Sequence, residues 1–520
     1  MKYSIILSLF LLIISSCQTE ESKSWTLVPY PNSVSIRPGS FPFDQGITIL
    51  SSYSNLNHTI SFFKKKLNDL EIDVNNNSDK IIELELVSST EKKSESYELH
   101  VSKERIKLTA SDPKGIFYGL MTIWQQLRFS NSKTIPCGYI QDEPRFEYRG
   151  FMLDESRHFF GKEKVIQLID LMAIFKLNTF HWHLTDESGW RIEIKALPRL
   201  STIGGKGNAD NPDAPAKFYT QEEIKEIIVY AANRYITIIP EIDMPGHASA
   251  ANRAYPEFSG GGSEKRPDWT FDIGKESTYR YLNTILEEVA GLFPSKYIHL
   301  GGDEVHFGNE KWSTNDSIQS LMKREGLKTL VEAEHYFTRT MAAKLHKLNK
   351  ELAGWDEIIE SGVSNNNTLV YWWRHDKEEL LKKSLTKGYN TILCPRIPLY
   401  FDFVQHNTHS NGRRWGGAFG NIEDVYQYPD NIHNFSDEEM NLIKGIQANL
   451  WTEKFDTEKW IDFMTFPRLL ALSEAAWTMK KNKDFSRFNK NLPLVFEFLE
   501  EQGIYYFNCL IPTLRAEPQE

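Results

Sequence analysis

Tyr297-Ile298-His299-Leu300-Gly301-Gly302-Asp303-Glu304-Val305 is the stretch that decides the fold. Its apolar start predicts a short buried strand, and the two glycines allow the backbone to turn before two adjacent carboxylates. In a barrel of parallel strands, the chemistry takes place just after the carboxyl ends of the strands. Two carboxylates this close do not both ionise easily, so we expect one to stay protonated near neutral pH and act as an acid. Most Asp-Glu pairs are solvated surface, but the strand and the glycines argue against that interpretation here.

The same pattern of a strand followed by polar residues recurs along residues 146–480. From Arg149 onward, short apolar runs alternate with amphipathic stretches such as 164–175, 222–232 and 278–292, which is typical of a parallel α/β fold. Eight such units predict a (β/α)8 barrel. The predicted strands are Gly150–Leu153, Thr179–Leu184, Ile236–Ile242, Tyr297–Leu300, Glu351–Trp355, Leu369–Trp373, Thr391–Leu393 and Gly445–Trp451.

A smaller α+β domain is predicted before the barrel, in residues 17–145. Asp112 and Pro113 open a helix there, as N-cap and first-turn residue. We place the end of this domain in a linkage at 137–145, which is flanked by prolines, and we expect residues 481–520 to form a C-terminal helical segment packing on the barrel. The predicted strands of the small domain are 34–36, 47–50, 81–87, 97–101 and 105–109, the last two forming a hairpin.

Composition excludes several functional classes. The chain has 520 residues, 40% of them hydrophobic, which is enough for a large core and too long for one ordinary domain. A net charge of −10 without a long basic run makes nucleic acid an unsuitable partner. Four cysteines are too few for a disulfide framework, and the absence of C-x-x-C argues against a thiolate zinc site. The 13 Trp and 22 Tyr suit a core, but also the flat walls of a sugar site.

The first residues predict export. Lys2 precedes an apolar run over 5–14 that is too short to span a bilayer, so we interpret residues 1–16 as a signal peptide. Ile14-Ser15-Ser16-Cys17 resembles the lipobox of bacterial lipoproteins, in which the cysteine is diacylated. We therefore expect lipidation at Cys17 and a lipid anchor in a bacterial membrane, in the periplasm or at the cell surface. The alternative is a plain secretory signal with a chance cysteine.

The residues that follow the predicted strands suit a site for a terminal sugar. Polar and acidic groups follow strands one to four, and indoles follow strands five, six and eight. Sugar hydroxyls need charged, bidentate partners, and a pyranose ring needs aromatic walls. The charged candidates are Arg157, Asp402 and Glu453, and the aromatic candidates are Trp355, Trp373, Tyr400 and Trp451.

His181 and His183 leave a second interpretation open. Alternation places both on one face of strand two, and His-x-His is a known metal-ligand arrangement. A metal-dependent hydrolase would need further ligands from later strands, where this chain offers indoles. We therefore interpret both as hydrogen-bonded interior groups and predict no metal.

Several motifs together resemble glycoside hydrolase family 20, the β-N-acetylhexosaminidases. The resemblance covers about residues 25–478, including the small domain before the TIM barrel. The motifs that carry it are His299-x-Gly-Gly-Asp303-Glu304, Asp243-Met-Pro-Gly-His247, Ser156-Arg157-His158 and His181-Trp-His-Leu-Thr-Asp186.

The resemblance implies a retaining exo-hydrolysis, without metal or cofactor, of terminal β-linked N-acetylglucosamine or N-acetylgalactosamine. The 2-acetamido oxygen of the substrate attacks the anomeric carbon and forms an oxazolinium ion, so the enzyme supplies no nucleophile. Chitobiose, N-glycans and mucin-type glycans are all compatible substrates. The sequence does not distinguish a monomer from a homodimer.

By the same resemblance, Glu304 is the general acid and then base, and Asp303 orients the acetamido N–H and stabilises the developing positive charge. Asp186 and His247 form a relay that tunes Glu304. The remaining roles concern binding: Arg157 on O3 and O4, Asp402 and Glu453 on O4 and O6, Trp355, Trp373 and Trp451 as walls of the pocket, and Tyr400 on the acetamido carbonyl.

Two features depart from the family pattern. Trp372-Trp373 offers two candidates for one wall, and residues 405–420, with Arg413-Arg414-Trp415, match nothing; they could extend the cleft or bind an anionic substituent. Two other functional classes compete. A glycan-binding lipoprotein would be expected to lose the acid, and a hydrolase with a metal or its own nucleophile would not place its carboxylates side by side as Asp303 and Glu304.

Overall fold

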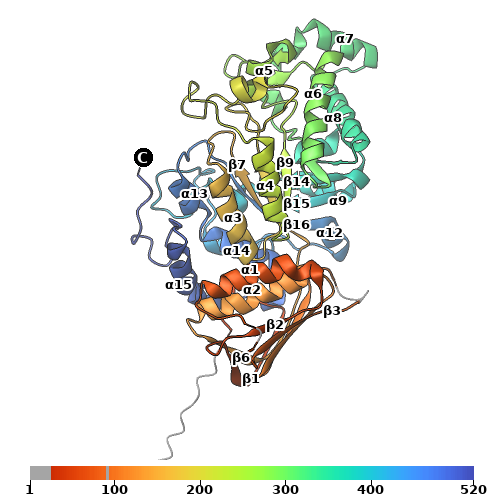
Figure 1. Ribbon diagram of the computed structural model, residues 1–520. Helices are drawn as coiled ribbons and strands as arrows, with labels where there is room; N and C mark the ends of the chain where they lie inside the picture. The colour runs from red at the N-terminus through yellow and green to blue at the C-terminus, as the bar shows by residue number, and fades with distance from the viewer. Residues whose placement is uncertain (1–24, 76, 89–92, 520) are drawn as a thin grey trace, which may run out of the picture.

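The structure is a computed structural model that describes residues 25–75, 77–88 and 93–519. A sheet domain lies at one end of the molecule and a barrel at the other, with helices α1 (Asn57–Asn68) and α2 (Pro113–Phe129) between them (Figure 1). The predicted signal peptide and Cys17 lie outside the described residues. Within the described part of the chain, no helix combines the length and the apolar character needed to cross a membrane.

The sheet domain contains the predicted strands and helix. Asp112 caps α2 by accepting a hydrogen bond from the backbone N–H of Gly115 at 2.9 Å, and Pro113 occupies the first turn, as expected. The hairpin is confirmed, because β4 and β5 pair in antiparallel fashion. Among the described residues the sheet has the order β1-β6-β4-β5-β3-β2, with β1 Ser33–Pro42, β2 Thr48–Leu50, β3 Ile81–Leu86, β4 Tyr97–Val101, β5 Arg105–Ala110 and β6 Thr134–Asp142.

Strand β6 corrects the linkage that we expected at 137–145. It lies in the interior of the sheet, between β1 and β4. Pro136 is tolerated there because it faces Ser40, next to an irregularity in the β1–β6 register where the regular ladder is already interrupted. The proline therefore marks a local irregularity in a strand and not the end of the domain.

The eight predicted barrel strands are confirmed. In the described chain they close a barrel in the order β12-β13-β14-β15-β16-β7-β8-β9, and every neighbouring pair is parallel. Their bounds are β7 Tyr148–Asp154, β8 Thr179–His183, β9 Thr237–Glu241, β12 Tyr297–His299, β13 Glu351–Trp355, β14 Thr368–Trp372, β15 Asn390–Leu393 and β16 Ile443–Leu450.

Helices connect these strands along the chain. The longer ones are α3 Lys162–Ile174, α4 Gln221–Ala232, α6 Glu276–Leu292, α8 Leu330–Lys347, α9 Glu378–Thr386, α14 Arg468–Trp477 and α15 Phe485–Glu501. Shorter ones lie in the connections: α5 Ser249–Ala254, α7 Asp316–Glu325, α10 Arg396–Leu399, α11 Ile422–Gln427, α12 Asp437–Leu442 and α13 Glu458–Thr465. A small hairpin, β10 (Ser259–Gly261) with β11 (Thr270–Phe271), follows α5.

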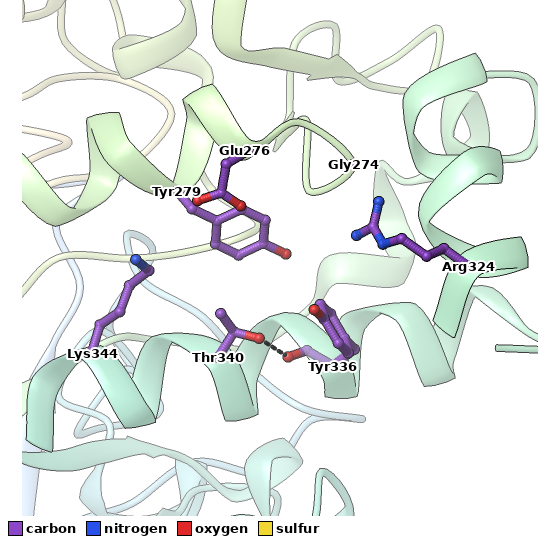
Figure 2. Close-up of a pocket in the computed structure, with 7 residues that line it drawn as sticks. All are labelled: Gly274, Glu276, Tyr279, Arg324, Tyr336, Thr340 and Lys344. Carbon is purple, nitrogen blue, oxygen red and sulfur yellow. Dashed lines mark hydrogen bonds between the residues drawn. The ribbon is translucent and has the colours of Figure 1, made fainter. Parts of the chain in front are cut away.

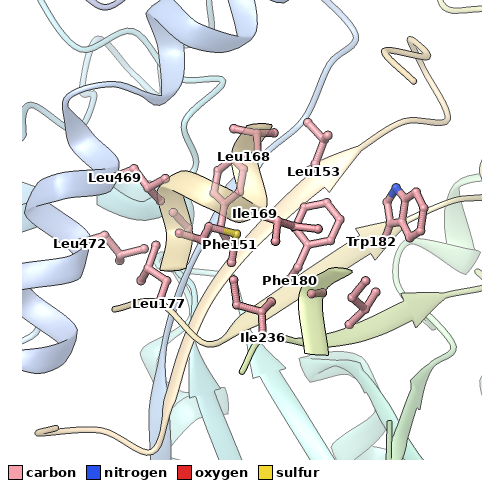
Figure 3. Close-up of a cluster of buried hydrophobic side chains, with 14 of the residues drawn as sticks. Phe151, Leu153, Leu168, Ile169, Leu177, Phe180, Trp182, Ile236, Leu469 and Leu472 are labelled. Atoms are coloured by element: carbon pink, nitrogen blue, oxygen red, sulfur yellow. The ribbon is translucent and has the colours of Figure 1, made fainter. Parts of the chain in front are cut away.

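Alternation along the strands separates the core from the site. Phe180 and Trp182 of β8 point to the helical layer, where α3 and α14 contribute leucine and isoleucine side chains (Figure 3). His181 and His183 alternate with them and point to the barrel interior, where the ring of His181 lies 5.3 Å from that of Tyr371 on β14. The apolar face of the strand thus fixes where its polar face must lie.

A buried ionic network joins the two domains. Lys176, which follows α3, lies 3.0 Å from Asp142 at the end of β6, and the indole N–H of Trp477 on α14 donates to the same carboxylate at 3.0 Å. Helix α15, the helix of the C-terminal segment, also contacts the sheet domain, through Phe498 against Trp124 of α2 at 5.3 Å between ring centroids. Because these groups are buried, the sheet domain and the barrel share one continuous core.

Candidate active site

The turn after β12 presents the two adjacent carboxylates. Gly301 and Gly302 have positive φ angles of 64° and 89°, and Glu304 is also left-handed, at 52°. A Cβ atom at Gly301 would lie 1.8 Å from Oδ1 of Asp243, so only glycine fits. The turn leaves Asp303 buried, with its side chain 12% exposed, while the side chain of Glu304 is 28% exposed. The predicted strand and the predicted turn after it are therefore both present.

His247 bridges the carboxylate pair to a third acid. Its Nδ1 lies 2.8 Å from Oδ1 of Asp186, and its Nε2 lies 3.5 Å from Asp303 and 3.9 Å from Glu304. Burial lowers the pKa of His247, but the charges of Asp186 and Asp303 outweigh it and raise the pKa to about 9. The imidazole is therefore positively charged at neutral pH, facing both carboxylates.

The surroundings of Asp303 raise the pKa of its carboxyl group. Burial raises the pKa of Asp303 to about 6, the charge of His247 opposes the rise, and the charge of Glu304 adds to it. Asp243 lies next to this group and accepts a long hydrogen bond from the N–H of Gly302, at 3.4 Å. Burial, followed by the charge of Asp303, raises the pKa of Asp243 well above its usual range.

Arg157, after β7, is held by two acids and an indole. Its Nη1 lies 2.7 Å from Asp186 and 3.5 Å from Asp154, and its guanidinium carbon lies 5.2 Å from the ring centroid of Trp451. These contacts fix the orientation of the guanidinium. The buried Nε has no hydrogen-bond partner within the described part of the chain, so Arg157 keeps a donor for another group.

Glu241 organises the interior below the site. The carboxylate accepts hydrogen bonds from His183, at 2.5 Å on Oε2, and from the Trp355 indole N–H, at 2.9 Å on Oε1, while ring nitrogens of His181 and His299 lie 3.1 Å and 2.9 Å from it. His181 accepts a hydrogen bond on Nδ1 from the Gln447 amide at 3.1 Å. The two histidines of β8 are thus hydrogen-bonded interior groups, as expected. Sequence reasoning assigned no role to Glu241, whose importance depends on the register of four neighbouring strands.

Three groups of side chains in the described chain are close enough to hold a metal ion: His181 with Glu241 and His299, His183 with Asp186 and Asp243, and Asp243 with His247 and Asp303. In the first, His183 and the Trp355 indole already donate to the two oxygens of Glu241, and Nδ1 of His299 accepts from the N–H of Gly301 at 3.1 Å. In the second, the guanidinium of Arg157 at 2.7 Å from Asp186 opposes another cation. In the third, the positive charge of His247 likewise opposes the binding of a cation.

The aromatic candidates form a connected wall. The ring centroids of Trp355 and Trp451 lie 5.8 Å apart, those of Trp451 and Tyr400 6.1 Å, and those of Tyr400 and Trp373 6.3 Å. Trp372 lies apart from this wall and packs against His433. The structure therefore places Trp373, of the two adjacent tryptophans, with the other predicted site residues.

Asp402 and Glu453 are joined by Arg413, which belongs to the segment that the sequence suggested would extend the cleft or bind an anionic substituent. Arg413 lies 3.0 Å from Asp402 through Nε and 2.7 Å from Glu453 through Nη2. Burial raises the pKa of Asp402 to about 7, the charge of Arg413 opposes the rise, and that of Glu453 adds to it. Arg413 lies in 405–420, the segment that matched no family motif.

Several buried polar atoms at these strand ends have no hydrogen-bond partner among the described residues. They are Nε of Arg157, Oδ1 of Asp303, Oδ1 of Asp402 and the indole nitrogen of Trp451. Unpaired buried polar atoms are costly, so their concentration at one place indicates a site for a polar ligand. Donors and acceptors are both present, as a polyhydroxylated ligand requires.

A separate cavity lies on the outer helices. It has a volume of about 360 Å³ and is bordered by α6, α7 and α8, with Tyr279, Arg324, Tyr336 and Lys344 around it (Figure 2). None of its lining residues belongs to the group at the strand ends. Its charged side chains are long and surface-exposed, as Arg324 is at 61%.

Fold and site together define an acid–base enzyme built on a (β/α)8 barrel. The model of glycosyl hydrolase family 20, catalytic domain, matches residues 146–480, and that of domain 2 of the same family matches residues 24–143. The chain therefore belongs to glycosyl hydrolase family 20, and the resemblance stated from its motifs is confirmed.

Individual relatives agree with this assignment. A β-hexosaminidase of Porphyromonas gingivalis is 34% identical over 94% of this chain, which spans 65% of that relative's length. The structure of a family 20 exo-β-N-acetylglucosaminidase from Vibrio harveyi, in complex with N-acetylglucosamine, is 35% identical, with a TM-score of 0.84 over 93% of this chain and 78% of that one. A β-N-acetylhexosaminidase from Bacteroides fragilis is 31% identical, with a TM-score of 0.82 over 95% and 100%.

Proposed function

We propose that the chain is an exo-acting, retaining β-N-acetylhexosaminidase that removes terminal β-linked N-acetylglucosamine or N-acetylgalactosamine by substrate-assisted catalysis. The observation that carries the proposal is the pairing of buried Asp303 with partly exposed Glu304 on one turn, with His247 facing both. The names of the relatives and the N-acetylglucosamine bound in the Vibrio harveyi structure support the same substrate class.

In this proposal the two carboxylates have different tasks. Glu304, the more exposed, protonates the departing glycosidic oxygen and then deprotonates the water that opens the intermediate. Asp303 holds the N–H of the acetamido group and stabilises the positive charge as the acetamido oxygen attacks the anomeric carbon. His247, held by Asp186, keeps a positive charge beside both, and this charge opposes the rise in the pKa of Asp303.

The remaining residues would bind the sugar. Arg157 offers its free Nε to the hydroxyls at positions 3 and 4, and Asp402 and Glu453 accept from those at positions 4 and 6. The wall formed by Trp373, Tyr400 and Trp451 would enclose the acetamido group and one face of the ring.

The test is hydrolysis of p-nitrophenyl β-N-acetylglucosaminide, with and without EDTA, followed by the N-trifluoroacetyl analogue. Release of p-nitrophenol unaffected by EDTA is expected. Fluorination withdraws electrons from the acetamido oxygen, so turnover of the analogue should slow steeply, and a thiazoline mimic of the intermediate should inhibit tightly. Equal rates for the two substrates, or trapping of a glycosylated carboxylate by a 2-deoxy-2-fluoro sugar, would contradict the proposed mechanism.

We also infer that the protein is exported and anchored by lipid at Cys17. The inference depends on the apolar run that ends in Ser15-Ser16-Cys17. A single acyl chain binds membranes only marginally, so stable attachment needs the diacylated cysteine. Cys17→Ala should shift the enzyme from the membrane fraction to the soluble fraction, and unchanged partition would contradict the inference.

A further inference from the structure

Arg413 reaches the two carboxylates that would bind the sugar hydroxyls. Its Nε lies 3.0 Å from Asp402 and its Nη2 lies 2.7 Å from Glu453. We propose that Arg413 is a specificity-determining residue of the same site, which holds Asp402 and Glu453 as a pair of ionised acceptors for neighbouring hydroxyl groups of the terminal sugar. The inference rests on the proposed function, because it concerns the substrate of that site.

Backbone contacts close the loop that carries Arg413. The N–H of Arg413 donates to the carbonyl of Asp402 at 2.8 Å, and the N–H of Val404 donates to the carbonyl of Arg413 at 3.1 Å. Gly412 has a φ of 131°, and a Cβ atom there would lie 2.8 Å from the Val404 side chain. The two ends of the loop, residues 402 and 413, are therefore fixed next to each other.

The middle of the loop is fixed as well. His409 is buried, with its ring 5.0 Å from that of Phe463 and 4.5 Å from that of Phe507. Glu517 accepts hydrogen bonds from the backbone N–H groups of Ser410, at 2.8 Å, and Asn411, at 3.0 Å. A loop packed at both its ends and its middle presents Arg413 in a defined position.

The charges around Asp402 explain why an arginine is needed. Asp402 is 2% exposed; its Oδ2 is ion-paired with Arg413, and its Oδ1 has no hydrogen-bond partner within the described residues. Burial and the charge of Glu453 raise its pKa to about 7, while the charges of Arg413 and the more distant Arg468 lower it, and the hydroxyl of Tyr400 also faces it. Without Arg413 the pKa of Asp402 would rise further, and the protonated carboxyl would donate a hydrogen bond where the proposal needs an acceptor.

The same charges argue against an anionic substituent as the partner of Arg413. With both carboxylates ionised, Asp402, Glu453 and Arg413 together carry a net charge of −1, so a sulfate or phosphate group at this place would be repelled. The nearby guanidinium of Arg157 is already paired with Asp186 at 2.7 Å. Neutral hydroxyl groups suit this arrangement.

The experiment compares kcat/KM for aryl β-N-acetylglucosaminide and its 4-deoxy and 6-deoxy analogues. Arg413→Met should lower kcat/KM on the parent substrate by about tenfold or more. On at least one deoxy analogue the loss should be less than about threefold, because that analogue lacks the hydroxyl group that Asp402 and Glu453 would bind. Arg413→Lys keeps the charge and should recover part of the loss. Arg324→Met, which removes an exposed charge on α7, is the control and should behave as wild type on all three substrates.

The profile of kcat/KM against pH supplies a second readout. The acid limb should move to higher pH in Arg413→Met on the parent substrate, because Asp402 loses the charge that favours its ionised form. Equal losses on all three substrates would make Arg413 a structural residue and overturn the proposal. Unchanged activity on the parent with a loss only on a 6-O-sulfated substrate would also overturn it. If the methionine variant does not fold, Arg413→Gln is measured in its place. A wild-type enzyme that does not hydrolyse the parent substrate would refute the proposed function instead.

Discussion

Asp303 and Glu304 are neighbours in the chain with different surroundings. The side chain of Asp303 is 12% exposed, and burial raises its pKa to about 6, whereas the side chain of Glu304 is 28% exposed. A proton donor must reach the leaving group from the open side of the site, while a group that stabilises charge acts best out of water. The single left-handed turn after β12 gives the two residues these two environments.

Glu304→Gln should distinguish substrates by their leaving groups. The variant cannot protonate the departing oxygen, so kcat/KM for a disaccharide should fall by about 10²- to 10⁴-fold, and much less for a dinitrophenyl glycoside, which needs no proton. Steady-state kinetics on both substrates measure the difference, and the circular dichroism spectrum controls for folding. Equal losses on the two substrates would give Glu304 a different role.

The pH dependence of activity should reflect the ionisation of Asp303. The proposed mechanism needs this carboxylate ionised, and its pKa is raised to about 6, so activity should fall steeply as the pH drops through about 6, below the loss that protonation of Asp402 causes near pH 7. Asp303→Asn should lower the rate and also remove this limb from the profile of kcat/KM. An unchanged acid limb in the variant would assign it to another group.

How much of the site could be predicted depended on how local each signal was. Asp303 and Glu304 stand next to a strand and two glycines, so the sequence predicts their position. Arg413 and Glu453 are 40 residues apart, and they meet only because a closed loop returns to the strand ends. That contact depends on tertiary packing, which residue spacing does not reveal.

At the scale of elements, parallel strands proved easier to predict than interrupted ones. The barrel strands are short apolar runs bounded by polar residues, and all eight were predicted. The sequence predicts a linkage where β6 lies, because Pro136 in the first half of this strand is usually a breaking signal. The irregularity opposite it in β1 makes the proline acceptable, and only the pairing of the two strands reveals this.

The turn after β12 should tolerate no side chain at its first glycine. Gly301→Ala combines a positive φ with a Cβ 1.8 Å from the Asp243 carboxylate, so it should cost several kcal/mol and displace Asp303. Gly326→Ala is the matched control: its φ of 68° is similar, but no atom lies within 4 Å of the added Cβ. It should cost about 1 kcal/mol. Urea unfolding and activity measured on both variants test this, and similar losses would mean that steric contact with Asp243 is unimportant.

At the scale of the whole molecule, the sheet domain and the barrel are joined by buried charges. Lys176 lies 3.0 Å from Asp142, both side chains are about 1% exposed or less, and burial lowers the pKa of Lys176. Removing one partner of such a pair is more costly than replacing both. The two domains should therefore unfold together, although their sheets are separate.

Asp142→Asn tests this coupling. The variant leaves the buried ammonium of Lys176 without a counter-charge and should lower the free energy of unfolding by about 3–5 kcal/mol, while the double variant with Lys176→Met should recover much of that loss. The midpoint of urea unfolding, followed by tryptophan fluorescence, measures both. Lys93→Met, which breaks an exposed pair with Glu143, is the control and should change little. Failure of the double variant to recover would locate the effect in the hydrogen bonds that Asp142 accepts from Trp477, Tyr97 and Asn32.

The contact of Glu517 with Ser410 and Asn411 has a practical consequence for handling the protein. Purification tags, fusion partners and proteases usually act on the ends of a chain, where they are assumed to be harmless. Here a residue of the C-terminal segment holds the loop that delivers Arg413. A preparation clipped before Glu517, or fused closely behind it, could therefore retain every catalytic group and still rank its substrates differently from the intact chain.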